Sequence, residues 1–452
     1  MAASLITFAV ILTITEVENN FKTDYQQNSM KDAVFTIVAK NYIGLAQVLE
    51  KSVRTNSDAD FFIFVADEFD VDKVEIPSNV IIGKTNLSIT AALWTEMSFK
   101  YNLVEFCTAI KPYCFNFLFD QKGYDKIIYL DPDVYVFNSL KQVFDNLDSH
   151  SILVTPHILD MQTPFKGPYA DYFFLLNGTF NLGFIGLKKS GDSFKMLNWW
   201  KDRLNDQCFF DNDRGMATDQ KWINLLPAFF DSNVLKISFD RGLNVAPWNY
   251  HEREIVVRDN QLFVRKRDDE NSDLTPLTFV HFSGYDYRAF ANKTIAHKNE
   301  NADVYPDLNY LYEQYAAALS DDCFNKYIGL AYSYNRYENG RNIISLHRRI
   351  FRRLLNEGFS FNDPFSIGKN SLYDGLRKRR LIDPSISSAD AVTNKTVPGF
   401  DKKIKWVNWL FRTIQSVIGV RRYSIFIRFF RRYFKEENQA FLFDNNMKGK
   451  LW

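Results

Sequence analysis

Short apolar runs alternate with helical segments along the first half of this 452-residue chain, and this alternation limits the folds open to it. Ala33–Ala39 and Phe61–Ala66 are β-branched or aromatic runs bounded by polar residues, as is typical of buried strands. Gly44–Arg54, between them, has apolar residues at helical spacing. Val80–Ile82 and Lys126–Leu130 are predicted to be further strands. Strands that alternate with helices pair in parallel, so we expect an α/β sheet with ligands at the carboxyl ends of its strands.

The same pattern gives a domain division. Residues 96–119 are predicted to form a helix that is broken or bent at Pro112, and Phe180–Leu187 and Leu277–Phe282 to add strands to the same sheet. Beyond about residue 300 the alternation fades, which fits a chain longer than the roughly 250–300 residues that one core accommodates. Residues 305–357 are predicted to be helical and 359–400 loop-like. We therefore expect an appendage at 1–29, an α/β domain at 30–300, a helical extension at 301–400 and a separate tail at 401–452.

The first 29 residues are expected to lie outside the fold. Residues 4–14 are apolar, but eleven residues are too few to cross about 30 Å of hydrocarbon as a helix. A basic n-region and a clear cleavage site are both missing, so a secretory signal is weakly supported, and a short interfacial anchor remains the alternative. Four scattered cysteines form neither a disulfide framework nor a zinc motif, so a reducing compartment is expected.

The most informative motif follows the predicted strand Lys126–Leu130. Asp131 and Asp133 are spaced i, i+2, so both side chains point to one side of an extended segment. Two carboxylates placed this way repel each other unless a cation lies beside them, and a hard divalent ion with open positions for substrate phosphates suits them. A solvated Asx-Pro turn is the alternative.

Five islands in this order resemble a known family. The strand-terminal Asp131-Pro132-Asp133 resembles the D-x-D motif of GT-A glycosyltransferases, and the set resembles glycosyltransferase family 8 and related bacterial polysaccharide transferases. The other islands are Lys40-Asn41-Tyr42, Phe180-Asn181-Leu182-Gly183, Thr218-Asp219-Gln220 and His281-Phe282-Ser283-Gly284. The resemblance covers roughly residues 33–290. It implies a GT-A, Rossmann-like fold: a mixed, mainly parallel sheet flanked by helices, here with a C-terminal helical extension.

The resemblance also implies roles for individual residues. Asp131, Asp133 and His281 would bind Mn²⁺ or Mg²⁺, since an imidazole beside two carboxylates suits Mn²⁺. A histidine within a strand is otherwise more often a core residue. Asp219 and Gln220 would be the catalytic pair at the donor sugar. The donor-binding residues would be Ala39, Asn41, Tyr42, Asp67, Lys111, Asn181, Gly183, Ser283 and Gly284. The family's lysine-rich continuation is replaced here by Tyr285-Asp286-Tyr287, which leaves the basic contacts of the diphosphate unassigned.

Three points stay open at this level. Lys111 is either a cation near the leaving diphosphate or a solvated helix lysine. Family 8 retains the anomeric configuration; an inverting enzyme would instead need a carboxylate base, for which Asp219, Asp211, Asp213 and Glu252 are candidates. The segment Asn244–Arg253, with Trp248, Asn249 and His251, has side chains suited to sugar binding or to a satisfied core.

The tail differs in charge from the rest of the chain. Lys402–Lys435 holds ten Lys or Arg and no acidic residue, while the whole chain carries only +1. Its apolar residues fall on a helical face in two blocks, which Gly419 is predicted to separate. Basic amphipathic helices with Trp and Phe are typical of membrane-interface segments, each cation contributing about 1 kcal/mol near an anionic leaflet. A packed helical subdomain is the alternative, and a nucleic-acid partner is not expected.

Together these features predict a metal-dependent glycosyltransferase. It would use a nucleotide-diphosphate sugar, with UDP as the expected nucleotide, and a glycan or lipid-linked glycan acceptor. We expect a cytoplasmic protein, peripheral on the inner face of the cell membrane, that acts in the synthesis of a cell-surface polysaccharide such as lipopolysaccharide. The alternatives are a sugar-phosphate nucleotidyltransferase and a non-catalytic membrane scaffold. The first would have a Gly-rich loop after the first strand, where Ala39-Lys40-Asn41-Tyr42 has no glycine.

Overall fold

A seven-stranded sheet lies at the centre of the protein. The computed structural model describes residues 30–69, 75–297, 304–320, 322–383, 399–444 and 447; the expected appendage at 1–29 lies outside this part. The strand order is β10-β6-β7-β4-β1-β2-β3. The strands are β1 (Asp32–Val38), β2 (Asp60–Val65), β3 (Val80–Ile82), β4 (Lys126–Leu130), β6 (Ile152–Val154), β7 (Phe184–Lys188) and β10 (Leu235–Ile237).

The pairing confirms the predicted fold class. β1 is parallel to β2 and to β4, β2 is parallel to β3, and β10 is parallel to β6. β7 alone runs antiparallel to its neighbours β4 and β6, which makes the sheet mixed but mainly parallel. The first four strands lie within one residue of their predicted bounds, because continuous apolar runs with polar ends are typical of strands covered on both faces.

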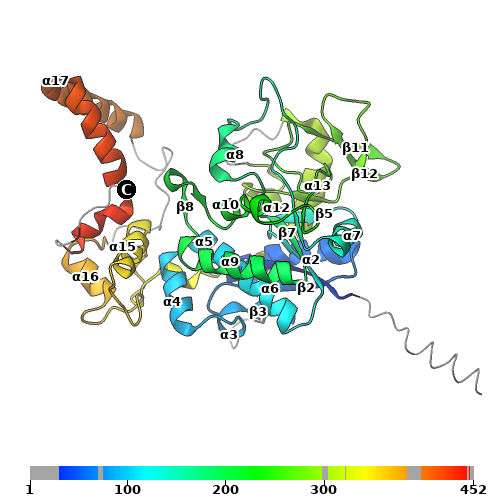
Figure 1. Cartoon of the computed structure of the whole chain (residues 1–452), viewed down its shortest axis with the longest axis horizontal. Helices are drawn as coiled ribbons and strands as arrows, with labels where there is room; N and C mark the ends of the chain where they lie inside the picture. Colours follow the sequence, from blue (N-terminus) through cyan, green and yellow to red (C-terminus); the bar gives the residue numbers. More distant parts are fainter. Residues whose placement is uncertain are drawn as a thin grey trace, which may run out of the picture.

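Helices cover both faces of this sheet (Figure 1). Alternate residues of β1 belong to different cores: Phe35 and Ile37 pack in one cluster, Val34 and Val38 in another. The first cluster includes residues of α6 (Lys111–Asp120) and α9 (Gly191–Gln207), and the second includes residues of α2 (Ile43–Asn56) and α7 (Lys141–Ser149). Shorter elements complete this domain: η1 (Lys40–Tyr42), α3 (Gly83–Asn86), α8 (Tyr172–Asn177), η2 (Asn212–Arg214), α10 (Gln220–Ile223) and α11 (Leu226–Phe229).

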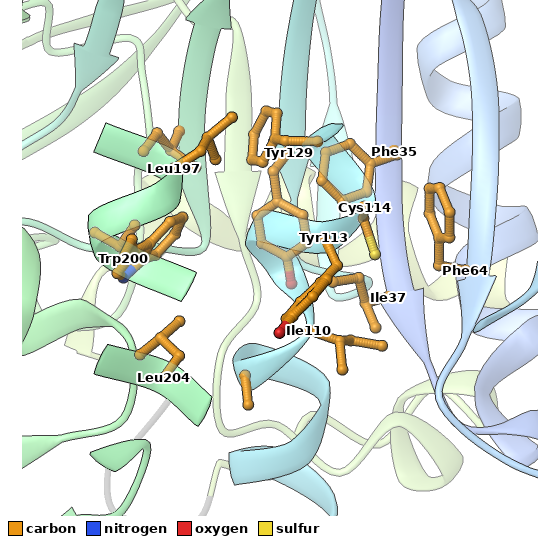
Figure 2. Close-up of a cluster of buried hydrophobic side chains, with 14 of the residues drawn as sticks. Phe35, Ile37, Phe64, Ile110, Tyr113, Cys114, Tyr129, Leu197, Trp200 and Leu204 are labelled. Atoms are coloured by element: carbon orange, nitrogen blue, oxygen red, sulfur yellow. The ribbon is translucent and has the colours of Figure 1, made fainter. Parts of the chain in front are cut away.

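Aromatic side chains of the first cluster pack closely against strands β1 and β4. Figure 2 shows Phe35 of β1 next to Tyr129 of β4, with Trp200 of α9 on the other side of Tyr129. The rings of Phe35 and Tyr129 lie 5.2 Å apart, and Phe35 meets Phe115 of α6 edge-on at 4.8 Å. Edge-to-face aromatic contacts of this kind each add about 0.5–1.5 kcal/mol to burial. The end of β4, which leads directly into Asp131, is therefore tightly fixed.

The single helix predicted over residues 96–119 is wrong. Three helices occupy this region: α4 (Ala91–Lys100), α5 (Leu103–Ala109) and α6. Asn102 and Glu105 form a capping box that begins α5. Arg348 donates hydrogen bonds to the carbonyls of Phe99 and Tyr101 at the end of α4. Pro112 does not break a helix, because it lies in the first turn of α6, where a missing N–H costs nothing.

The prediction that Leu277–Phe282 joins the main sheet is also wrong. β14 (Phe279–His281) instead pairs antiparallel with β5 (Val134–Val136), the strand that follows Asp133. This small sheet places His281 opposite Val134. A separate sheet contains β11 (Arg253–Arg258), β12 (Gln261–Lys266) and β13 (Thr275–Pro276), and a hairpin joins β8 (Phe210–Asp211) to β9 (Met216–Ala217).

The C-terminal region is largely helical, as predicted for residues 305–357. Its elements are α12 (Tyr287–Ala291), η4 (Pro306–Leu308), α13 (Asn309–Leu319), α14 (Asp322–Tyr327), η5 (Ser333–Asn335), α15 (Ser345–Asn356), α16 (Leu372–Lys378), α17 (Phe400–Tyr433) and η6 (Glu436–Leu442). α16 lies inside the stretch predicted to be loop-like. Gly419, at φ 76° and ψ 160°, divides α17 into two helices, which confirms the predicted break. Among the described residues, none of the helices is long and apolar enough to cross a membrane.

Candidate active site

Asp131, Asp133 and His281 meet at the carboxyl end of β4. The two aspartates lie in the turn between β4 and β5, and the pairing of β14 with β5 brings His281 to them. His281 Nε2 lies 3.1 Å from Asp133 Oδ1 and 3.7 Å from Asp131 Oδ2. One ligand atom from each residue lies within 4.8 Å of the others. Two carboxylate oxygens and an imidazole nitrogen this close together fit a divalent ion such as Mn²⁺.

A tyrosine fixes each carboxylate of this cluster. Tyr129 donates a hydrogen bond to Asp131 Oδ1, and Tyr287 donates one to Asp133 Oδ2 at 2.7 Å. The remaining oxygen of each carboxylate faces His281. Neither tyrosine was among the predicted site residues. Tyr129 precedes Asp131 by two residues on the same side of the strand, so its position could have been predicted; Tyr287 reaches the site only through the tertiary fold.

Charge interactions set the protonation of the cluster. Burial raises the pKa of the Asp131 carboxyl above its usual range. Burial acts the same way on Asp133, but the His281 imidazole and the hydrogen bonds outweigh it and lower the pKa of Asp133. For His281, burial favours the neutral ring, yet the Asp133 and Asp131 carboxylates outweigh it and raise the histidine pKa. The cluster therefore attracts positive charge at its centre.

Asn181 and Gly183, both predicted, lie directly against the histidine. Asn181 Oδ1 lies 3.3 Å from His281 Nδ1 and accepts from the Gly183 N–H at 3.1 Å. An Nδ1–H that donates to this amide leaves Nε2 with a lone pair directed at the carboxylates, the tautomer that a metal ligand needs. A Cβ at residue 183 would lie 2.4 Å from His281 Cε1, so glycine is required there for the imidazole to fit.

Lys111 and Asp219 form a buried ion pair beside the cluster. Lys111 Nζ lies 2.6 Å from Asp219 Oδ2, and each residue is at most 2% exposed. The ammonium also donates to the Leu182 carbonyl and lies 3.9 Å from the centre of the Tyr129 ring. Lys111 is thus not a solvated helix lysine. The ion pair joins the predicted donor-sugar aspartate to the strand that carries the metal cluster.

Gln220 is held by backbone groups on both sides of its amide. Its Oε1 accepts from the Leu182 N–H at 3.0 Å, and its Nε2 donates to the Asn177 carbonyl at 2.9 Å. Thr218, two residues earlier, has φ 48°, a left-handed conformation that is rare for a β-branched residue. Strained backbone of this kind tends to occur at functional sites. The Asp219–Gln220 pair is therefore held in one fixed conformation.

The predicted nucleotide-binding residues lie at the ends of β1 and β2. Asp67 is fully buried and accepts from the Glu68 and Ser333 N–H groups, with Lys40 Nζ at 3.7 Å. Burial raises the Asp67 pKa. Among the described residues, Asp67 Oδ2 and Asn41 Oδ1 are buried without a hydrogen-bond partner, and polar atoms left in this way are available to a ligand.

Three further predicted residues flank these groups. Ala39 is buried at the end of β1, while Tyr42 is 38% exposed. Burial, and then the charge of Asp133, raises the pKa of Tyr42 above its usual range. Ser283 and Gly284 lie two and three residues after His281, and a Cβ on Gly284 would lie 2.7 Å from His297 Nε2. The contribution of Ser333 to the Asp67 site was not predicted, because it comes from the C-terminal extension.

Three of the candidate bases for an inverting reaction, Glu252, Asp211 and Asp213, have hydrogen-bond or ion-pair partners within the protein. Glu252 accepts from the Leu159 and Asp160 N–H groups, so its carboxylate closes a loop. Asp211 Oδ1 lies 3.2 Å from Lys435 Nζ, and Asp213 lies 3.6 Å from the same lysine.

The segment with Trp248, Asn249 and His251 is buried, and Trp248 Nε1 and both ring nitrogens of His251 have no hydrogen-bond partner among the described residues. Asn249 is fully buried and its side chain makes three hydrogen bonds to backbone groups. Burial lowers the pKa of His251 to about 4. The Trp248 ring packs edge-on against the His281 imidazole, 5.2 Å between centres. Trp248 therefore packs against the imidazole of the Asp131–Asp133–His281 cluster.

This chain is similar to two curated bacterial proteins and to several solved structures. No family model matches it. The uncharacterized protein YfnF of Bacillus subtilis strain 168 is 26% identical over 292 residues, which cover 63% of this chain and 91% of YfnF. The galactosyltransferase LgtC, solved with donor and acceptor sugar analogs, is 16% identical with a TM-score of 0.38, covering 64% of this chain and 95% of LgtC. Mouse xyloside xylosyltransferase 1 is 12% identical with a TM-score of 0.30, covering 56% of this chain and 98% of that one. Both of these solved structures are glycosyltransferases.

Proposed function

We propose that this chain is a metal-dependent GT-A glycosyltransferase that takes a sugar from a UDP-sugar or similar donor. The observation that carries the proposal is the convergence of Asp131, Asp133 and His281 within 4.8 Å at the carboxyl end of β4. In open α/β sheets, ligands bind at the carboxyl ends of the strands. A divalent ion held there would act as a Lewis acid for the charge of the leaving diphosphate.

The other predicted residues have environments that suit their proposed roles. Asp219 would accept hydrogen bonds from hydroxyls of the donor sugar, because Lys111 fixes the position of its carboxylate. Gln220 would lie beneath the anomeric carbon, with its amide held by Leu182 and Asn177. Asp67 and Asn41 would bind the nucleoside through their unpartnered oxygens. Lys40, whose side chain is 17% exposed, places its ammonium 3.7 Å from Asp67 at this end of the site.

We propose transfer with retention of configuration. The acceptor hydroxyl oxygen forms the new bond to the anomeric carbon while the bond from that carbon to the diphosphate breaks. The bonding electron pair leaves with the diphosphate, and an oxygen of that group takes the hydroxyl proton. This route needs no protein base, which agrees with the occupied state of Glu252 and Asp211.

The proposal extends to a membrane partner. α17 carries the exposed side chains of Trp406, Trp409, Val417 and Val420, each at least 59% exposed, among its basic residues. Of the α17 residues whose side chains are described, none is buried, and Figure 1 shows the helix projecting from the body beside α15. Exposed apolar and basic side chains on one helix favour attachment to an anionic membrane surface. The acceptor would then be a lipid-linked glycan of a cell-surface polysaccharide on the cytoplasmic side.

Metal-dependent hydrolysis of nucleotide sugars tests the enzymatic proposal. The full chain is incubated with UDP-, GDP- and dTDP-sugars, with and without a chelator, and nucleoside diphosphate release is measured. Asp131→Asn should lower the rate at least about a hundredfold, since it removes one charged ligand of the ion that offsets the diphosphate charge. Asp202→Asn, an exposed control, should not. Full activity after exhaustive chelation would refute the proposal. Release of pyrophosphate from a nucleoside triphosphate and a sugar phosphate would instead identify a nucleotidyltransferase.

A further inference from the structure

A pocket of about 450 Å³ lies beside the catalytic pair, between segments far apart in the sequence. It is lined by Asn102, Leu103, Val104, Glu105, Phe210, Thr218 and Asn335. These residues come from the start of α5, the β8–β9 hairpin with the residue after it, and the end of η5. In Figure 1, β8 lies next to α5. The volume is within the range of about 300–1,000 Å³ that small-molecule sites occupy.

The buried carboxylate of Glu105 joins the start of α5 to the β8–β9 hairpin and to α15. Glu105 is 1% exposed, and it accepts from the N–H groups of Asn102 and Phe210 at 3.0 and 2.9 Å. Arg349 of α15 donates to both of its oxygens, at 3.2 and 2.7 Å. Because this charge is paired within the protein, it does not repel or attract a charged ligand strongly. The pocket is thus a built feature and not a gap between loops.

The surface of the pocket suits a sugar ring. Phe210 and Val104 are 57% and 63% exposed although the Phe210 backbone is fixed, so an aromatic face and an apolar side chain are open to a ligand. Two amides and a hydroxyl, from Asn102, Asn335 and Thr218, stand among them. None of the seven lining residues is Lys or Arg. An apolar face with a few amide and hydroxyl groups recognises a neutral pyranose better than a phosphate or a carboxylate.

The pocket also opens at the proposed point of reaction. Thr218 lines it, and the hydroxyl of Thr218 donates to Asp219 Oδ1 at 3.1 Å. A ring bound against Phe210 would therefore lie next to Thr218 and the proposed donor-sugar residue Asp219. The strained backbone of Thr218 fixes this junction.

The membrane tail joins the rim of the same pocket. Lys435, just after α17, lies 3.2 Å from Asp211 of the β8–β9 hairpin, and Arg214 of that hairpin lies 2.6 Å from Glu437. A hairpin tied to the end of a membrane-bound helix would face an acceptor whose lipid lies in that membrane.

We propose that this pocket binds a neutral sugar ring of the glycan acceptor, with Phe210 as its stacking platform. The inference rests on the proposed function, because only a glycosyltransferase has an acceptor glycan. The proposed function concerns the donor site, whereas this inference names residues that would select the acceptor.

Sugar binding and donor hydrolysis are measured separately on the full chain. The probes are p-nitrophenyl glycosides of galactose, glucose and N-acetylglucosamine, with the glucuronide as an anionic comparison, titrated by saturation-transfer NMR. Phe210→Ala should weaken binding of the neutral probes at least about fivefold, the factor for about 1 kcal/mol of aromatic contact. Phe210→Trp should restore it. Phe229→Ala, an aromatic of similar exposure on α11, is the matched control.

The two proposals fail in different ways. Metal-dependent donor hydrolysis by Phe210→Ala should stay within about twofold of the unchanged protein, which also shows that the variant is folded. Absence of hydrolysis in the unchanged protein would refute the proposed function whatever the probes do. Equal probe affinity in Phe210→Ala and Phe229→Ala, no neutral probe bound at all, or the glucuronide bound best, would each overturn the acceptor pocket.

Discussion

Removing the charge of Lys111 while keeping its length should destabilise the protein strongly. In Lys111→Met, the buried Asp219 carboxylate loses a partner at 2.6 Å, the Leu182 carbonyl loses a donor at 2.9 Å, and the Tyr129 ring loses its cation. The methionine side chain fills nearly the same space, so a cavity contributes little. What remains is a carboxylate that is 3% exposed and retains the Thr218 hydroxyl as a donor.

The magnitude follows from the burial of the pair. Breaking a buried ion pair by removing one partner costs about 3–5 kcal/mol, since the other charge is left without compensation. Removing both charges costs less, because similar apolar side chains then fill the site. The double variant Lys111→Met/Asp219→Leu should therefore lose less free energy of unfolding than the two single variants lose together, by at least about 1 kcal/mol.

Urea unfolding of the single and double variants measures these free energies. Lys141→Met is the matched control, because Lys141 and Asp145 also lie 2.7 Å apart but are 77% and 51% exposed. Solvent and salt screen such surface pairs, so the control should change stability little. If Lys111→Met cost no more than Lys141→Met, or if the two single effects simply added, the pair would not be the buried, coupled element described above.

Three other predictions address chemistry, the membrane and pH. NMR of the fresh transfer product should show the anomeric configuration of the donor; an inverted product would refute the assigned roles of Asp219 and Gln220. Trp406→Ser with Trp409→Ser should release the protein from anionic liposomes, whereas Phe229→Ser with Phe239→Ser, on the α/β body, should not. Attachment should also weaken with salt as the Debye length falls from about 10 Å at 0.1 M to about 3 Å at 1 M, and salt-independent attachment would contradict an electrostatic contribution. Burial lowers the pKa of His347 to about 4, so the unfolded chain is protonated first and stability falls as pH drops from about 6.5 towards 4. His347→Gln should flatten that decline relative to His150→Gln in urea unfolding, and parallel curves would show that His347 does not titrate in this window.

Local patterns were sufficient to predict five of the seven strands of the sheet, all but β6 and β10, and to place Asp131 and Asp133 at the end of one of them. Lys126–Leu130 is one uninterrupted apolar run, and the two aspartates after it share a side at i, i+2 spacing. His281 was identified through its motif, and β14 carries it to the site although that strand joins β5 instead of the main sheet. An apolar run predicts a strand but does not say which strand it will pair with, so the sheet assignment of 277–282 failed.

Contacts between distant segments account for most of what was missed. Tyr287 binds Asp133 across 154 positions in the sequence, and Ser333 binds Asp67 across 266. One cause of the helix break at Tyr101–Asn102 could have been predicted from the sequence, since Asn102 and Glu105 have the spacing of a capping box. The other cause is Arg348, which comes from α15 and donates to the carbonyls at the end of α4. Lys111 could be taken as a solvated lysine because the residues around it in the sequence show neither its burial nor its pairing with Asp219.

The C-terminal extension is therefore part of the architecture around the candidate active site. The Arg348 guanidinium is 1% exposed and donates to the carbonyls of Ser98, Phe99 and Tyr101, where α4 ends and α5 has not begun. Buried carbonyls that lose their donors cost about 1–3 kcal/mol each. The adjacent Arg349 neutralises Glu105, on which the proposed acceptor pocket depends. One turn of α15 thus fixes both the helix break and the pocket, so the extension and the α/β domain should unfold as one unit.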